Sequence, residues 1–367
     1  MSGAALPAPR GRTAHRLVRS GSARASLVVL ALIALACLFG PRLTGRAPER
    51  AYPDLRQLPP SLTAQPSPTT LRPALERIAF RMRAALAEVE ERDGRLRLVL
   101  TAPGGVDERA LVYLPRSDLF GTPRVVARED GGRRLTVEVP VRRLHFPLGT
   151  DIHGRDLLTR ILVAGRISLV VGLVATLVAG GLGIAWGATA GLAGGAVDAA
   201  MMRAVDVLYA LPFVFFVIVL VVLFRPGLIL ILIAIGAVEW LDMARLVRAQ
   251  TLALSRRDFF RAARALGVSG LRLVTRHVLP NALGPVIVAA TLLVPRVILL
   301  ESFLSFLGLG VQEPETSWGV LVAEGARAIE SAPWMLAGPA GFLVATLVAL
   351  NRLGDALADA ADPRSGL

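Results

Sequence analysis

Long apolar segments constrain this chain more than any other feature, because a folded soluble domain has no room to bury so many of them. One segment covers residues 26–40, and five more follow residue 160. Each has, or nearly has, the roughly 20 residues with which an α-helix crosses a bilayer. The pattern predicts an all-α polytopic membrane protein with about six transmembrane helices, at 26–40, 167–192, 204–224, 227–243, 283–303 and 334–351.

The distribution of arginine orients these helices. The segment 245–281 contains eight Arg and one acid, whereas 304–332 contains four Glu and one Arg. Loops rich in Arg stay in the cytoplasm. We therefore expect the Arg-rich residues 1–25, the 245–281 loop and the C-terminus to be cytoplasmic, with 41–160 outside.

The first apolar segment admits two interpretations. It is an anchor helix if Arg24 and Arg42 extend to the two interfaces, and Cys37 is then one of its small apolar side chains. It also has features of a cleaved signal peptide, with Cys37 near the cleavage point. The five later helices keep the same orientation in either case.

Residues 41–146 differ in composition and predict a small α+β extracytoplasmic insert. The Pro-rich stretch 58–70 is typical of a linker. Helical spacing over 73–94 ends at Gly94. Short strands are expected at 95–100, 110–114, 123–128 and 134–139, with glycine turns between them. The insert either contacts a partner or serves as a spacer or cap.

Composition excludes several classes of activity. All 41 Lys/Arg residues are Arg, so the chain lacks the Lys with which a P-loop holds nucleotide phosphates. The single Cys cannot form an intrachain disulfide, and the four His are scattered. We expect no catalytic site, no metal and no cofactor, and any ATP-driven work requires a partner.

The segment 259–281 predicts two short amphipathic helices in the cytoplasm. In the first, Phe259, Ala262, Ala263 and Leu266 share a face. Gly267 permits a turn with positive φ, and Ser269 can cap the second helix. In the second helix Leu271, Val274 and Val278 align, and Pro280 ends it.

Three functions fit this helix pair: an interfacial helix on anionic lipid, an element that docks on a partner protein, or a DNA-binding helix-turn-helix. The DNA interpretation is physically weak, because the recognition helix would begin with mostly apolar residues and cannot reach base edges. We therefore expect no nucleic-acid partner.

Several blocks of the chain, in order, resemble one protein family, the permeases of binding-protein-dependent ABC importers, and in particular the C-type permease of dipeptide, oligopeptide and nickel importers. The resemblance covers about residues 147–364. It rests on PLGTDIHGRDLLTRILVAGRISL (147–169), VDAAMMRAVDVLYALP (197–212), ARLVRAQTLAL (244–254), AARALG and HVLPN within 262–281, ESFLSFLGLGVQEPETSWGVLV (301–322), SAPW (331–334) and LGDALADAADPR (353–364).

This resemblance implies an ABC importer permease fold, with 245–281 as the loop that couples it to an ATPase. The implied partners are a second homologous permease, two cytoplasmic ATPase subunits, an extracytoplasmic solute-binding protein and the lipid bilayer. Arg261 departs from the family, which has a Glu of its EAA motif there. The implied coupling residues are Arg261, Ala262, Ala263, Ala265, Leu266, Gly267, Leu271, Val274, His277, Leu279 and Pro280.

Polar residues within or next to the apolar segments form a second set of candidates. Glu301 aligns with an acidic position of the family, and Arg296 lies five residues earlier, too far around a helix to pair well with it. Asp206 and Pro212 belong to the family's Asp-Arg-Asp-Pro stretch. We expect structural or pathway roles for these four, and interfacial positions for Trp240, Trp318 and Trp334.

The function that follows is a multi-pass inner-membrane permease subunit without an ATPase site of its own. Peptides are the expected solute. Nickel or another small solute is the alternative within transport, and a membrane-anchored helix-turn-helix regulator is the alternative from another class.

Overall fold

The computed structural model describes residues 20–92, 94–224 and 227–361. These divide into two compact units. The first, called here the helical unit, comprises the described residues up to Leu43, Ile161–Glu324 and those from Pro339 on. The second, called the insert, comprises Thr44–Arg160 and Gly325–Gly338. Residues 1–19 of the predicted cytoplasmic N-terminus and 362–364 of the C-terminal block lie outside the described residues.

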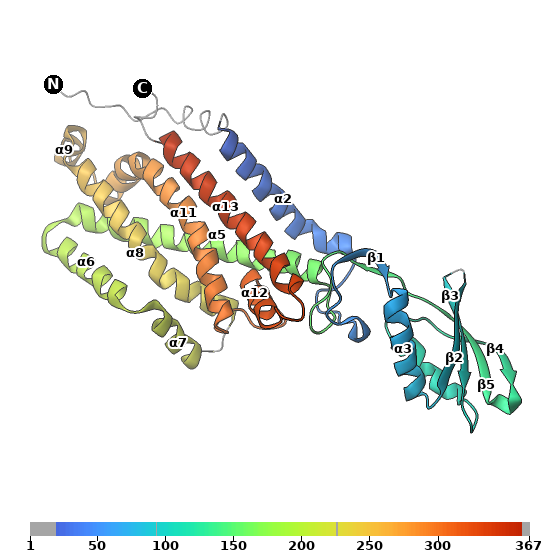
Figure 1. The fold of residues 1–367 in the computed structure, drawn as a ribbon. Helices are drawn as coiled ribbons and strands as arrows, with labels where there is room; N and C mark the ends of the chain where they lie inside the picture. The colour runs from blue at the N-terminus through green and yellow to red at the C-terminus, as the bar shows by residue number, and fades with distance from the viewer. Residues whose placement is uncertain (1–19, 93, 225–226, 362–367) are drawn as a thin grey trace. The chain divides into compact units, whose positions relative to one another are not determined.

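Helices account for the helical unit (Figure 1). Within the described residues, four helices are long and apolar enough to cross a membrane: α2, α5, α13 and the continuous segment 270–306 that ends with α11. In chain order the helices are α2 (Gly21–Thr44), α5 (Leu157–Ala193), α6 (Gly195–Ala210), α7 (Phe213–Leu223), α8 (Leu228–Ser255), α9 (Asp258–Ala265), α10 (Gly270–Leu273), a π turn (Val274–Val278), α11 (Leu279–Phe306), α12 (Trp318–Arg327) and α13 (Trp334–Ala361).

The span predicted at 204–224 corresponds to two helices rather than one. It breaks after Leu211 into α6 and α7, which are bent by 81° and together form a fifth candidate span. Pro212 removes a backbone donor and forces the preceding residue out of the helical region. Leu211 accordingly has an extended ψ of 128°.

Charged residues lie within one predicted span and prolines lie within two others. The span predicted at 227–243 corresponds to α8, which is long enough but carries Glu239, Asp242, Arg245 and Arg248. Pro285, Pro295 and Pro339 lie inside α11 and α13 and end neither helix.

Glycines of α5 allow another helix to approach closely. A Cβ at Gly183 would lie 2.5 Å from Cβ of Met243, and one at Gly187 would overlap the carbonyl oxygen of Ala244. Both neighbours belong to α8. The glycine-rich face therefore sets the distance between α5 and α8, as small residues do in membrane helix pairs.

The insert contains a four-stranded antiparallel sheet in the order β2-β3-β5-β4. Its strands are β2 (Ala85–Arg92), β3 (Arg95–Thr101), β4 (Arg124–Glu129) and β5 (Arg134–Pro140). Alternate residues of β3 and β5, among them Leu98 and Val137, turn inward and form a core with apolar residues of α3 (Pro68–Arg81). A separate two-stranded sheet joins β1 (Ser61–Gln65) to β6 (Leu144–Phe146). Short helical turns are η1 (Pro53–Leu55), η2 (Glu108–Val112), α4 (Tyr113–Arg116) and η3 (Asp130–Gly132).

Three sequence predictions for the insert are confirmed and three are wrong. The strands expected at 95–100, 123–128 and 134–139 are β3, β4 and β5. The helix expected over 73–94 ends at Arg81, and 85–92 forms β2 instead, because pairing with β3 satisfies its backbone. The strand expected at 110–114 is the turn η2 followed by α4, and the linker expected at 58–70 contains β1 and the start of α3.

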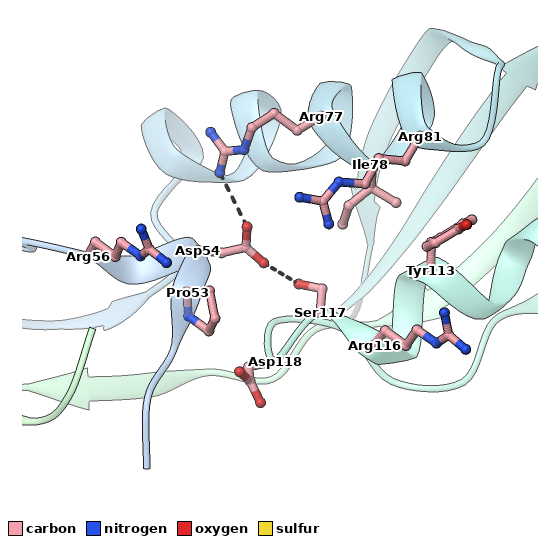
Figure 2. A pocket seen from close by; sticks show the side chains of 10 residues that line it. All are labelled: Pro53, Asp54, Arg56, Arg77, Ile78, Arg81, Tyr113, Arg116, Ser117 and Asp118. Atoms are coloured by element: carbon pink, nitrogen blue, oxygen red, sulfur yellow. Dashed lines mark hydrogen bonds and ion pairs between the residues drawn. The ribbon is translucent and has the colours of Figure 1, made fainter. Parts of the chain in front are cut away.

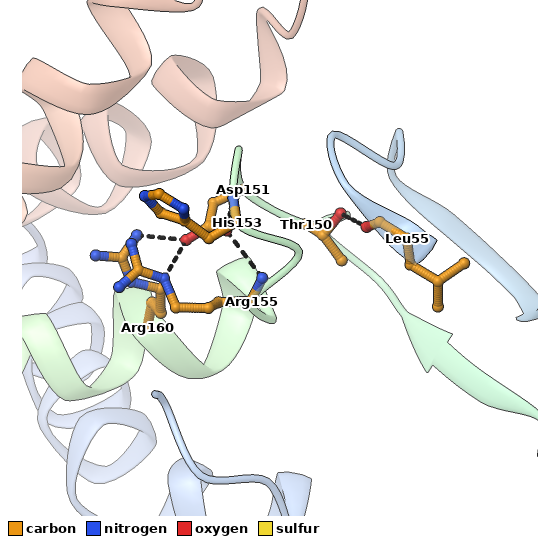
Figure 3. Close-up of polar contacts among 6 residues, drawn as sticks. All are labelled: Leu55, Thr150, Asp151, His153, Arg155 and Arg160. Carbon is orange, nitrogen blue, oxygen red and sulfur yellow. Dashed lines mark hydrogen bonds and ion pairs between the residues drawn. The ribbon is translucent and has the colours of Figure 1, made fainter. Parts of the chain in front are cut away.

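An arginine–aspartate cluster lies where the insert leads into α5 (Figure 3). The fully buried Asp151 accepts hydrogen bonds from the backbone N–H groups of His153 and Arg155, both at 2.8 Å. Its Oδ2 also accepts from Nε of Arg155 at 2.6 Å and Nη1 of Arg160 at 2.7 Å. One carboxylate therefore closes the 151–155 turn and pairs with two arginines that are largely removed from water.

We predict that Asp151→Asn destabilises the protein by about 3–5 kcal/mol, because it removes the buried charge that contacts the guanidinium groups of both Arg155 and Arg160. The measurement is thermal unfolding of the purified chain in detergent. Asp118→Asn is the control, because its pair with Arg50 is partly exposed and is worth about 0–1 kcal/mol. Equal losses in both variants would contradict the role of the cluster.

We predict that Gly183→Val lowers the stability of the helical unit by about 1–3 kcal/mol through overpacking against α8. The same substitution at Gly180, where an added Cβ meets nothing within 4 Å, changes the helix propensity equally. Thermal unfolding of the two variants side by side isolates the packing effect, and a Gly180→Val protein as unstable as Gly183→Val would refute it.

Candidate functional site

The 258–281 loop turns sharply at Gly267. This residue has φ +76°, the left-handed conformation that favours glycine. Backbone N–H groups of Leu266, Gly267 and Val268 donate to carbonyl groups of α9 at 3.0–3.2 Å, which satisfies the last turn of that helix. The predicted turn between two helices is confirmed.

The face of α9 that packs inward differs from the predicted one. Phe260 is buried together with Leu254, Leu273 and Val278, and Ala263 packs against this group. The buried face of α9 therefore includes Phe260 instead of the predicted Phe259. Phe259 is 44% exposed, and Leu266 and Leu271 are 84% and 77% exposed.

The second helix of the loop also differs from the prediction. Ser269 occupies the N-cap position of α10, but its side chain makes no capping hydrogen bond. Pro280 does not end the helix, since α10 continues through the π turn into α11. Pro280 lies in the first turn of α11, directly after the π turn, where a missing backbone donor is tolerated.

The outward surface of the loop is therefore both apolar and basic. Of the predicted coupling residues, Ala263, Val274, His277, Leu279 and Pro280 are half-buried, and the ring of His277 lies 6.1 Å from that of Phe259. Arg261 pairs with Asp258 at 2.5 Å in the first turn of α9. We call the exposed set the loop surface: Phe259, Arg261, Ala262, Arg264, Ala265, Leu266, Gly267, Leu271, Arg272 and Arg276.

Ion pairs join α6 to α8 near this loop. Asp198 accepts two hydrogen bonds from the guanidinium of Arg248, at 2.5 and 2.6 Å. Asp206 accepts one from Arg245 at 2.9 Å, and that guanidinium also lies 4.4 Å from the ring of Tyr209. The sequence marked Asp206 but not its partner, because the two residues are 39 positions apart.

Glu301 is fully buried in the helical unit. Its carboxylate accepts a hydrogen bond from the hydroxyl of Ser305 at 2.7 Å and a longer one, 3.5 Å, from Ser168 of α5. The Ser168 hydroxyl also accepts from the backbone N–H of Trp318 at 3.1 Å. This arrangement ties α5 and α11 to the start of α12.

The interfacial position predicted for Trp318 is wrong. Its side chain is fully buried, and its indole N–H donates to the carbonyl of Ile161 at 3.0 Å. Trp240 is half-buried against Trp186, with ring centroids 5.2 Å apart. The indole of Trp334 donates to the carbonyl of Thr150 at 3.4 Å.

Arg296 pairs with α8 rather than with Glu301. Its Nη1 lies 2.8 Å from Asp242 and 3.9 Å from Glu239. The three side chains line a cavity of about 290 Å³ together with apolar residues of both helices. The poor stacking of Arg296 on Glu301 predicted from the helix geometry agrees with these partners.

The insert has a cleft of its own, of about 640 Å³ (Figure 2). Asp54 lies at its centre, where it accepts a hydrogen bond from Ser117 at 2.8 Å and pairs with Arg77 at 3.4 Å. Arg56, Arg81 and Arg116 also line it. Within the described part of the chain, no group of three His, Cys, Asp or Glu could hold a metal ion.

The helices and the loop define a membrane permease, and comparison with protein families agrees. Residues 183–366 match the family described as "Binding-protein-dependent transport system inner membrane component", and residues 9–60 match the "N-terminal TM domain of oligopeptide transport permease C". The chain belongs to this ABC permease family.

Similar proteins within this family are named for oligopeptide or dipeptide transport. The oligopeptide transport system permease protein OppC of Escherichia coli (strain K12) is 56% identical over 216 residues, which are 59% of this chain and 72% of that protein. OppC of Haemophilus influenzae is 50% identical over 236 residues, or 64% of this chain and 76% of that protein. The dipeptide transport system permease protein DppC of Bacillus subtilis (strain 168) is 45% identical over 247 residues, or 67% and 76%.

The sheet of the insert lies outside both family matches, because residues 61–182 fall between them. The family therefore accounts for the helical unit from Gly183 onward and for the first helix. It assigns no role to the four-stranded sheet or to the cleft beside it.

We predict that Phe260→Ala loosens the loop, because Phe260 is its largest fully buried side chain and removal of a buried Phe costs about 3–5 kcal/mol. Limited proteolysis should then cut within 256–270 at least several-fold faster. Phe259→Ala, at a 44% exposed position, is the matched control and should be cut at the original rate. Equal protection of the two variants would show that Phe260 does not anchor the loop.

Proposed function

We propose that this chain is one permease subunit of an ATP-driven importer that moves oligopeptides or dipeptides into the cell. The observation that carries the proposal is the loop surface, in which large apolar side chains stand exposed beside arginines on a rigid turn. Family membership and relatives named for oligopeptide and dipeptide transport support the solute class.

The loop surface suits a protein groove better than water. Leu266 and Leu271 are among the most exposed apolar residues of the described chain, and burying one Leu contributes about 1.5–3 kcal/mol. Their backbone is held in place from the other side by Phe260, Leu273 and Val278. A docked ATPase would therefore transmit its movement directly to α8 and α11.

ATP is bound and hydrolysed by the partner in this proposal, since the chain has no Lys for a P-loop. The importer contains two such ATPase subunits in the cytoplasm. A second, related permease completes the passage, and an extracytoplasmic binding protein delivers the solute. The N-terminus, the loop and the C-terminus are then cytoplasmic, and the insert is outside. The helices alternate between inward- and outward-facing states.

The other functions considered have less support. Nickel or another small solute remains the alternative cargo of the same machine, although the relatives reported above are named for peptides. A DNA-binding role fits poorly, because α10 is only four residues long and continues into an apolar helix. It offers no free recognition helix to a DNA groove.

We predict that Leu266→Asp combined with Leu271→Asp reduces co-purification of the ATPase subunits by on the order of 10-fold or more, because two charges replace the apolar anchors of the interface. ATP-dependent peptide uptake by proteoliposomes should fall in parallel. Retention of both properties would exclude the loop surface as the docking site.

The control for this experiment is Leu62→Asp in β1. Leu62 has the same 84% exposure as Leu266 but belongs to the insert. The substitution makes the same change in charge and hydrophobicity at a residue that is not part of the loop surface. ATPase co-purification and uptake should both stay at the wild-type level.

A further inference from the structure

Three ionisable side chains meet between the two apolar helices α8 and α11. Arg296 of α11 contacts Asp242 at 2.8 Å and lies 3.9 Å from Glu239. The cavity beside them, of about 290 Å³, has otherwise apolar walls formed by Met243, Leu246, Ala289, Leu292 and Leu293. We call Glu239, Asp242 and Arg296 the charged cluster.

The charged cluster lies deep within both helices. Glu239 lies 11 residues after Leu228, the first residue of α8. Arg296 lies 10 residues before Phe306, the last residue of α11. At 1.5 Å per residue, each is roughly 15 Å from that end of its helix. Glu239 and Asp242 lie within the segment predicted to cross the membrane at 227–243, and Arg296 lies within the one at 283–303.

Two members of the charged cluster are not covered by the described chain. The side chains of Arg296 and Asp242 are 59% and 46% exposed, whereas that of Glu239 is 10% exposed. Charges at this depth do not face lipid without a large cost, and they mark cavities and solute pathways. The open side of the charged cluster therefore faces a water-filled passage or another protein.

The charges of the cluster do not balance. Two carboxylates share one guanidinium, and the other arginines of α8 are engaged elsewhere, Arg245 with Asp206 and Arg248 with Asp198. A buried carboxylate without a cation is costly. The site is thus short of one positive charge, and Glu239 is the carboxylate farther from Arg296.

We propose that the charged cluster is a cation-binding site in the passage, which takes the α-ammonium group of a peptide as it crosses. The inference rests on the function proposed above. Asp242, held by Arg296, and Glu239 supply the carboxylates, and the apolar walls receive the adjoining side chain of the solute. A cation from the second permease could meet the same charge requirement, and the experiment separates the two.

The test compares uptake of a tripeptide with uptake of its N-acetylated form. The full importer is reconstituted in proteoliposomes, and the pair is chosen so that the binding protein binds both forms with equal affinity. The wild type should import the free peptide on the order of 10-fold faster, the usual size of a charge-pair effect at a desolvated site. In Glu239→Gln and in Asp242→Asn the ratio should fall to near one.

Asp355→Asn is the matched control, because Asp355 is an exposed carboxylate of α13 outside the charged cluster. It should keep the wild-type ratio. Equal uptake of both peptides by the wild type, an unchanged ratio in both cluster variants, or loss of the second permease from those variants would overturn the inference. A wild-type importer that moves neither peptide with ATP would instead refute the proposed function.

Discussion

The close approach of α5 and α8 is the contact on which most of the helical unit depends. Gly183 and Gly187 leave no side chain between the two backbones, so α8 is held at a fixed distance from α5. Polar contacts inside the unit then join α5 or α8 to a neighbouring helix. Asp198 and Asp206 reach α8 from α6, Arg296 reaches it from α11, and Glu301 is tied to α5 through Ser168. The loop surface begins four residues beyond the end of α8, so its position follows from the same contact.

The short loop has two sets of apolar residues, one buried against the helical unit and one exposed. Phe260, Leu273 and Val278 attach it to α8 and leave Leu266 and Leu271 outside. Both sets are apolar, and periodicity alone assigned the wrong set to the inside. A helix of eight residues has room for two overlapping apolar faces, and only contact with Leu254 and Leu192 decides between them.

In the insert, pairing between neighbouring strands outweighs the helix propensity of one segment. The strands β3, β4 and β5 follow from alternating apolar residues between glycine turns. The stretch 85–92 has helix-forming Ala and Glu, yet it forms β2, because its backbone pairs with β3 across a short turn. Such pairing between neighbouring strands overrides a weak local propensity.

The sequence by itself determined the class of protein, its family, the apolar segments that cross the membrane and the turn at Gly267. These depend on composition, on runs of apolar residues and on single residues with unique backbone properties, all of which are local. Only the tertiary structure decided the burial of Trp318, the outward face of the loop and the partners of Arg296. Each of these depends on which distant side chains come within a few ångströms, and no local pattern encodes that choice.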